Sequence, residues 1–242
     1  MCQLKSCLVL KDRVFCPDYN SHQQMLEELG IEDDYLHASK TFVRVEFTPP
    51  DNTKSLIEPL DRWTLNVDQD VTPEWWDAEA DRQRVEEAVE AWRREHVFAE
   101  GEHSISAGIV YALGNATVKA CDNATVKSYD NATVKAWDNS TVIACNSATV
   151  TAFDRATVEA CDSATVKAFD RATVKACDSA TVKAFDRATV KAHGNAKVEA
   201  FDIAIVKAFD IATVKAYNRA MVIYPEERKI IYPAGWTIET HE

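Results

Sequence analysis

The second half of the chain alternates small apolar and polar residues with a fixed period of eight. From about Asn115 to Met221, units such as ATVKACDN, ATVKAWDN and ATVKAFDR follow one another without interruption. Each unit predicts a strand, Ala-Thr-Val-x-Ala, followed by a turn with Asp or Asn, which suit tight turns. Strand alternation places Ala and Val on one face and Thr and Lys on the other. A short fixed period of this kind indicates a β-solenoid with the small apolar residues inward.

A second period of 16 residues runs through the same segment. The residue before the turn alternates between Cys and Phe, as at Cys161 and Phe169, and the residue after Asp alternates between Arg and Ser. We therefore predict a two-sided coil of 16 residues with two octapeptides per coil, because a three-sided coil of 24 would break the alternation. Stacked Cys at one corner and stacked Phe at the other are expected to fill a thin interior. Whether Phe153, Phe169 and Phe185 face the core or the solvent stays open.

Residues 1–104 lack the repeat and predict a small α+β domain. Apolar runs on both sides of residues 11–13 predict a hairpin, and alternation over 41–47 and 62–68 predicts two further strands. A capping box and a terminal glycine bound a helix within residues 21–30. The predicted fold is therefore mainly β, a two-sided solenoid preceded by a small α+β domain.

A long helix is expected to begin at Thr72 as its cap, with Pro73 at its first position, and to end near His96. The helix is rich in acidic residues. These form either a solvated face or a patch for a basic partner. The candidate interaction residues on this helix are Asp77, Asp81, Glu86 and Glu90.

The net charge of −12 is unevenly distributed. Residues 1–104 hold 11 Lys and Arg against 23 Asp and Glu, whereas residues 105–242 hold 16 of each. This contrast indicates two domains, with an acidic, capping domain over 1–104 and the repeat over 105–222. Residues 223–242 are expected to cap the other end, with a closing strand near Lys229. The acidic balance argues against direct nucleic-acid binding. The N-terminus does not read as a signal peptide, so we expect a cytoplasmic protein without membrane contact.

Motifs that would carry chemistry are missing from the sequence. The seven cysteines include no CxxC pair or zinc spacing, and the six glycines form no phosphate-binding loop. Asp68 and Asp70 flank one glutamine, and a polar turn after a strand is a better interpretation of this segment than a metal site. The Asp column of the repeat is explained by turn formation. We expect no enzyme activity, no cofactor and no bound metal.

Several stretches carry a resemblance that covers both halves of the chain. The chain resembles two-domain octapeptide-repeat proteins of gut-type bacteria and their phages. The stretches that carry the resemblance are KDRVFCPDYNSHQQMLEELGI, FVRVEFTPPD, WTLNVDQD and the repeat itself. The architecture is also loosely similar to pentapeptide-repeat solenoids, some of which mimic DNA, although the period here is eight and the repeat is electrically neutral. The resemblance implies an accessory protein that binds and inhibits a host defence protein.

Three functions remain open from the sequence. The first is a non-enzymatic scaffold that binds a host protein. The second is a filament protein that assembles with itself, which would make the chain a homo-oligomer. The third is a small enzyme in residues 1–104 with the solenoid as a stalk. For the first, the candidate surface of the repeat comprises Lys167, Arg171, Lys183 and Arg187.

Overall fold

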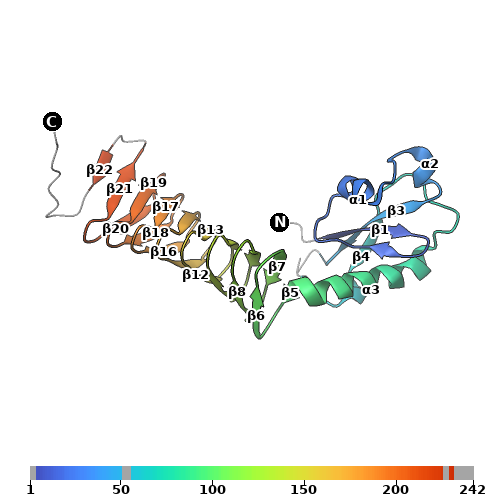
Figure 1. The fold of residues 1–242 in the computed structure, drawn as a ribbon, viewed down its shortest axis with the longest axis horizontal. Coiled ribbons are helices and arrows are strands. Elements are labelled where there is room, and N and C mark those ends of the chain that lie inside the picture. Colours follow the sequence, from blue (N-terminus) through green and yellow to red (C-terminus); the bar gives the residue numbers. More distant parts are fainter. Residues whose placement is uncertain (1–3, 51–55, 226–228, 232–242) are drawn as a thin grey trace. The chain divides into compact units, whose positions relative to one another are not determined.

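The computed structural model describes residues 4–50, 56–225 and 229–231, the last of these by their backbone alone. These residues belong to two compact units that divide the chain between Val97 and Phe98. The first is a small α+β unit and the second is the solenoid (Figure 1). The prediction of a mainly β fold with a two-sided solenoid after an α+β region is confirmed.

The first unit is built on an antiparallel sheet with the strand order β2-β1-β3-β4. Its strands are β1 (Lys5–Leu10), β2 (Val14–Phe15), β3 (Phe42–Thr48) and β4 (Thr64–Val67). The expected hairpin joins β1 to β2, with Leu8 opposite Phe15 and Val9 opposite Val14. Strand β3 is central, so its apolar residues are buried, whereas β4 lies at the edge and is largely exposed.

Helices cover both faces of this sheet (Figure 1). They are α1 (His22–Leu29), α2 (Tyr35–Ala38) and α3 (Ala78–His96), with a single 3-10 turn, η1 (Leu60–Arg62). Helix α1 has Ser21 as its N-cap and ends at Gly30, whose φ of 65° is the left-handed conformation that glycine tolerates. Met25 and Leu26 of α1 pack against Leu8 on one face of β1, and α3 packs on the other.

Helix α3 begins later than the sequence predicted. Its N-cap is Asp77, whose carboxylate accepts hydrogen bonds from the backbone N–H groups of Glu79 and Ala80. The residues from Pro73 to Trp76 form a turn instead, in which the Trp76 N–H donates to the Pro73 carbonyl. The Trp75 indole N–H also donates to the Lys40 carbonyl at 2.8 Å. This tertiary contact outweighs the Thr72-Pro73 start signal, so that expectation is wrong.

The solenoid consists of two sheets, and successive strands of the repeat belong to one sheet and the other in turn. We call them the even sheet and the odd sheet. The even sheet contains β6 (Glu102–Ile105), β8 (Thr117–Ala120), β10 (Thr133–Ala136), β12 (Thr149–Ala152), β14 (Thr165–Ala168), β16 (Thr181–Ala184), β18 (Lys197–Ala200) and β20 (Thr213–Ala216). The odd sheet contains β5 (Val97–Phe98), β7 (Ile109–Ala112), β9 (Thr125–Ser128), β11 (Thr141–Ala144), β13 (Thr157–Ala160), β15 (Thr173–Ala176), β17 (Thr189–Ala192), β19 (Ile205–Ala208), β21 (Met221–Tyr224) and β22 (Lys229–Ile231).

Between β7 and β21, neighbouring strands of each sheet are parallel and pair residues that are 16 positions apart in the sequence. Thr165 pairs with Thr181 and Val166 with Val182, and the same offset recurs along the even sheet. The inward Ala and Val side chains are almost all completely buried, with an exposed fraction of 0% for most of them. The sheets form a continuous Ala/Val core, because residues of this size fit the narrow space between two sheets. The alternative of a 24-residue coil is excluded.

Each turn of the solenoid uses one residue with positive φ. Asp or Asn occupies this position in most turns, with φ between 51° and 57°, and glycine occupies it in the others, at Gly101, Gly108, Gly114 and Gly194. Asp and Asn tolerate the left-handed region better than other residues that carry a Cβ atom. The Asp carboxylate has a second role, because it accepts a hydrogen bond from the turn N–H one coil earlier. Asp170, for example, accepts from the backbone N–H of Asp154.

The odd sheet ends in an antiparallel strand. Strand β22 pairs with β21, with Val222 opposite Ile231. The expected closing strand near Lys229 is therefore present, while residues 226–228 and 232–242 of the expected C-terminal cap lie outside the described residues. Within the described part of the chain, no helix combines the length and apolarity needed to cross a membrane.

Candidate interaction surface

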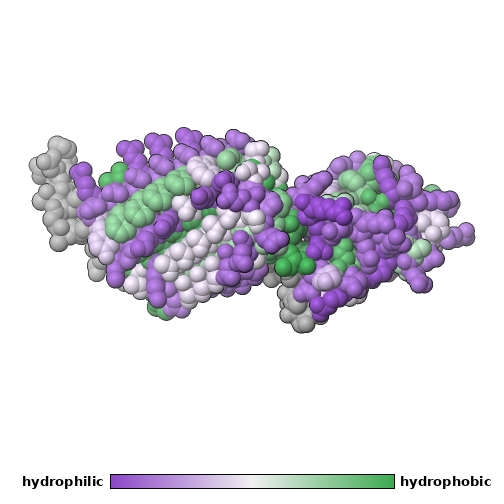
Figure 2. Space-filling model, turned by 90° about the horizontal axis from the view of Figure 1, so that it is seen from below, coloured by the Kyte–Doolittle hydropathy of each residue, from purple (hydrophilic) through white to green (hydrophobic). Residues whose placement is uncertain are grey.

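One edge of the solenoid carries a stack of aromatic rings. We call it the aromatic edge, and it is formed by the turns that follow the even-sheet strands. The ring centroids are 4.8–5.6 Å apart and the ring planes are within 8–13° of parallel. The members are Trp137, Phe153, Phe169, Phe185, Phe201 and Tyr217. An apolar stripe runs along the solenoid in Figure 2 between hydrophilic side chains.

These rings lie outside the Ala/Val core. The last strand residue before each ring, such as Ala168 before Phe169, points inward and is buried, so strand alternation turns the ring outward. The phenylalanines are half-buried by their stacked neighbours. The expectation that Phe and Cys fill the interior is wrong, because the thin space is already occupied by Ala and Val.

An arginine row runs beside the aromatic stack, separated from it by the Asp column. Asp154, Asp170 and Asp186 alternate with Arg155, Arg171 and Arg187 around a hollow of about 420 Å³. The carboxylates of Asp170 and Asp186 accept hydrogen bonds from backbone N–H groups of the preceding coil. The ion pairs among the described solenoid residues involve Lys119, Lys175, Lys183 and His193, and none involves these arginines. Three exposed guanidinium groups therefore stand at a regular spacing, free to donate hydrogen bonds.

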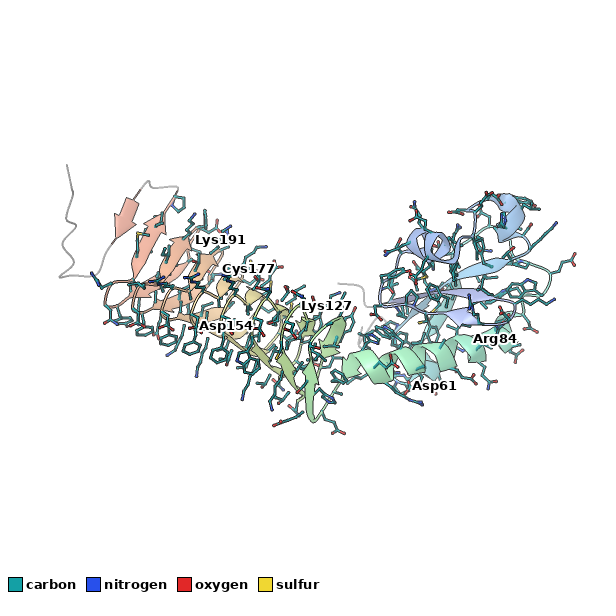
Figure 3. The ribbon with its side chains drawn as sticks, viewed as in Figure 1. Asp61, Arg84, Lys127, Asp154, Cys177 and Lys191 are labelled. Atoms are coloured by element: carbon teal, nitrogen blue, oxygen red, sulfur yellow. The ribbon has the colours of Figure 1, made fainter. Side chains whose placement is uncertain are left out.

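The opposite edge has a different character. Its turns follow the odd-sheet strands, and their leading residues include Tyr129, Cys145, Cys161 and Cys177. Asp154 and Cys177 lie at opposite edges of the solenoid in Figure 3. Burial and the neighbouring cysteines raise the pKa of the Cys161 thiol to about 12. The position that arginine occupies at the aromatic edge holds Ser147, Ser163 and Ser179 here, so these three turns lack the row of free cations.

The structure brings the predicted solenoid residues together. Arg171 and Arg187 line the hollow, and Lys167 and Lys183 are paired in register on the outer face of the even sheet. Lys183 forms an ion pair with Glu199 at 3.0 Å, whereas Lys167 is exposed. Arg155 was not among the candidate residues predicted from the sequence, and an outward ladder of Phe153, Phe169 and Phe185 was left there as an open alternative that would itself form an interface. The signal was present, since the 16-residue period and an inward Ala before each Phe together place the rings outward.

The predicted acidic residues of α3 make contacts within their own unit. Asp77 caps the helix, and Asp81 is buried with an exposed fraction of 4%. Asp81 accepts from the Asp77 N–H and pairs with an arginine one turn along the helix. Glu86 pairs with Arg82 at 2.8 Å, and Glu90 lies 3.5 Å from Arg93. An interaction role for these four residues stays a prediction, and these pairs reduce the charge they offer.

The first unit contains an acidic hollow of about 610 Å³ near the edge of its sheet. Asp68 and Asp70, which the sequence placed in a polar turn, line it together with Asp33, Asp34 and Arg44. Asp33 pairs with Arg44, and Asp68 accepts from His22 at 3.0 Å. The intervening Gln69 is fully used in hydrogen bonds to backbone groups. The polar-turn interpretation therefore accounts for this segment.

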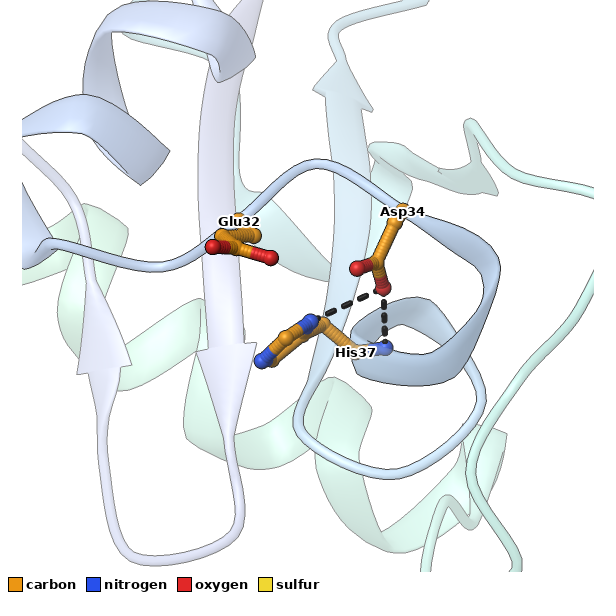
Figure 4. A group of neighbouring side chains, drawn as sticks. All are labelled: Glu32, Asp34 and His37. Atoms are coloured by element: carbon orange, nitrogen blue, oxygen red, sulfur yellow. Dashed lines mark hydrogen bonds and ion pairs between the residues drawn. The ribbon is translucent and has the colours of Figure 1, made fainter.

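Glu32, Asp34 and His37 place carboxylate and imidazole atoms within 4.8 Å of one another beside this hollow (Figure 4). Asp34 is the N-cap of α2, and one of its carboxylate oxygens accepts from both the backbone and the ring nitrogen of His37 at 2.8 Å. The hydrogen bonds from the backbone and the side chain of His37 lower the pKa of Asp34. The grouping is explained as a helix cap with solvent-exposed carboxylates.

Comparison with known proteins yields no relative, because the chain matches no family model, no curated protein and no solved structure. The geometry of the aromatic edge therefore carries the functional argument by itself. A regular β-solenoid fits a scaffold or a binding role.

Proposed function

We propose that the chain is a non-enzymatic binding protein whose contact surface is the aromatic edge of the solenoid. The supporting observation is that stacked aromatic rings and a row of arginines follow the same edge, on either side of the Asp column, and that these arginines have no ion-pair partner in the described part of the chain. Aromatic residues and arginine are enriched in the cores of protein interfaces and supply most of their binding hot spots.

The charges favour a partner protein with acidic side chains. The Asp carboxylates are engaged by backbone N–H groups, whereas Arg155, Arg171 and Arg187 extend beyond them without an ion-pair partner among the described residues. A guanidinium group binds a carboxylate through two parallel hydrogen bonds. A partner that presents Asp or Glu side chains along an extended segment would satisfy all three arginines.

The rigidity of the solenoid supports this role. The backbone of each coil is hydrogen-bonded to the coils before and after it, and the Ala/Val core beneath the edge is fully buried. The rings restrict one another's movement by stacking at about 5 Å. A surface that is ordered before binding loses little conformational entropy on association.

The resemblance to octapeptide-repeat proteins of bacteria and phages suggests where to look for the partner. We propose a bacterial host protein, with host defence proteins as the first class to test, and a cytoplasmic site of action. Inhibition of that protein is the activity we propose for a phage accessory role.

The test is affinity capture from a bacterial lysate with the full chain. The double variant Arg171→Glu/Arg187→Glu reverses two charges of the hollow. The matched control, Lys191→Glu/Lys207→Glu, makes the same charge change at two exposed, register-paired lysines of the odd sheet. We expect one stoichiometric partner with the natural chain and the control. The affinity for the arginine variant should fall by about tenfold or more, because acidic side chains of the partner would face carboxylates.

Equal capture by both double variants would contradict the proposed surface. Absence of any partner, with concentration-dependent light scattering by the chain alone, would favour self-assembly instead. Each variant is first compared with the natural chain in urea unfolding, so that a loss of folding is not mistaken for a loss of binding.

A further inference from the structure

Two cysteines of the first unit face each other across the β1–β2 hairpin. The register that pairs Leu8 with Phe15 and Val9 with Val14 continues to place Cys7 opposite Cys16. The Leu10 N–H donates to the Arg13 carbonyl, so Leu10 and Arg13 form a hydrogen-bonded pair. The two types of pair alternate along an antiparallel ladder, and Cys7 and Cys16 therefore occupy a non-hydrogen-bonded position.

This position brings the two thiols within bonding reach. Opposite Cα atoms at such a position are about 4.5 Å apart, which lies within the range that a disulfide spans. The two thiols shift each other's pKa in opposite directions, raising that of Cys7 and lowering that of Cys16. Both cysteines are in the reduced form in this structure.

The two thiols differ in access and in charge. Cys7 is completely buried, whereas Cys16 is partly exposed and lines a hollow of about 300 Å³ between the hairpin and α3. The hydrogen bond from Cys7 is the main cause that lowers the pKa of Cys16, and the nearby Lys5 ammonium acts in the same direction. Burial raises the pKa of Cys7. A thiolate is thus favoured on the accessible sulfur, and a protonated thiol on the buried one.

Lys5 is held in place beside this pair. Its ammonium group lies 4.7 Å from the centre of the Trp92 ring, and it donates to the backbone carbonyls of Pro17 and Tyr19. Asn20 also accepts a hydrogen bond from it at 3.3 Å. The positive charge is therefore fixed close to the sulfur atoms, whose anion it stabilises.

We propose that Cys7 and Cys16 form a thiol–disulfide exchange site in which Cys16 attacks small disulfides and Cys7 resolves the product. The Cys16 thiolate attacks one sulfur of a disulfide RSSR, forms a mixed disulfide and releases RS⁻. The Cys7 thiol then attacks the Cys16 sulfur, which forms the Cys7–Cys16 disulfide and releases the second RS⁻, and the Cys7 proton passes to one of the two released thiolates. The protein loses two electrons and one proton, and RSSR is reduced to one RSH and one RS⁻, which takes a proton from water.

The entrance to the site selects for charge. Asp18 and Glu95 line the hollow together with His96, which pairs with Asp18 at 2.7 Å. The carboxylates would repel an anionic disulfide and attract a cationic one. Cystamine is therefore expected to react faster than glutathione disulfide, whose peptide chains carry carboxylates.

The experiment incubates the full natural chain with cystamine at neutral pH and identifies the modified cysteines by peptide mapping. Cys121 of the solenoid, which is also partly exposed, is the internal reference. We expect Cys16 to react on the order of tenfold faster than Cys121, with Cys7 and Cys16 then lost together as one disulfide. In denaturant, the difference between the cysteines should disappear.

Two variants separate the proposed roles. Cys7→Ala should stop the reaction at the mixed disulfide on Cys16, whereas Cys16→Ser should leave the buried Cys7 unmodified. Cys121→Ser is the control and should behave as the natural chain. The proposal is overturned if Cys16 of the natural chain reacts no faster than Cys121, or if Cys7 reacts in the absence of Cys16. The comparison within the natural chain stands even where a variant fails to fold.

Discussion

The turn aspartates offer a direct measure of how the solenoid is stabilised, and Asp170 is the most suitable because it lies inside an unbroken column. It combines a positive φ of 54° with a carboxylate that accepts from the Asp154 N–H at 3.4 Å. Asp170→Ala loses the hydrogen bond, at a cost of about 1 kcal/mol, and places a less tolerant residue in the left-handed region, at a cost of about 1 kcal/mol more. Asp170→Gly loses the hydrogen bond but removes the backbone strain, so its cost is about 1 kcal/mol less than that of the alanine variant. Asp170→Asn keeps both features and should cost less than about 1 kcal/mol.

Urea unfolding followed by far-UV circular dichroism measures the order Asn, Gly, Ala from the least to the most destabilised. Hydrogen exchange at the Asp154 amide separates the two contributions, because this N–H loses its acceptor in the Gly and Ala variants and retains one in the Asn variant. If the alanine variant is as stable as the glycine variant, positive φ is not costly at this turn. If exchange at Asp154 is unchanged in all three variants, the carboxylate does not protect the amide.

Three further predictions concern packing and pH. Ala168→Leu inserts a large side chain into the fully buried Ala/Val core, so it should destabilise the chain by about 1–3 kcal/mol in urea unfolding. Lys167→Leu, exposed on the same strand, is the matched control. Gly114→Ala should lower the free energy of unfolding more than Gly194→Ala does, because a Cβ at Gly114 would lie 2.7 Å from the Ala99 carbonyl oxygen, whereas at Gly194 the nearest atom is 3.3 Å away. Equal urea midpoints for the two variants would contradict this prediction. Burial raises the pKa of Tyr129 from 10.0 to about 12, so the folded chain holds the phenol proton more tightly than the unfolded chain does. The stability that the protonated phenol contributes is complete below pH 10 and is lost as the pH rises towards 12. Tyr129→Phe should reduce this loss in unfolding measured across that range, and an unchanged pH dependence would count against the assignment.

Much of the solenoid follows from the sequence because its order is local and repeated. The alternation of Ala, Val and Ala specifies which side chains are buried, and the 16-residue period specifies which strands are neighbours. The position of the rings also followed in principle, since Phe169 comes directly after an inward Ala168. The prediction was wrong where it filled the interior with rings, because it did not compare the space between two sheets with the Ala and Val side chains already in it.

The first unit was less predictable because its details depend on contacts between distant segments. The start of α3 was set by Trp75, whose indole reaches Lys40, and not by the proline before it. The acidic patch on α3 was predicted from composition, yet Asp81 is buried in a network that only the folded helix creates. The opposition of Cys7 and Cys16 required the hairpin register, and the sequence alone did not determine the turn that sets it.

The 16-residue register has a consequence for how the repeat can change in length. Loss or duplication of two octapeptides removes or adds one complete coil, so that Phe still stacks on Phe and Cys on Cys, and the solenoid shortens or lengthens by about 4.8 Å. Loss of a single octapeptide would instead exchange the two sheets in every coil that follows, so that loss of residues 157–164 would place Cys177 above Phe153. Expansion and contraction of the gene are therefore expected to preserve the aromatic edge only when octapeptides are gained or lost two at a time. The number of coils can then vary while the surface chemistry of each coil stays the same.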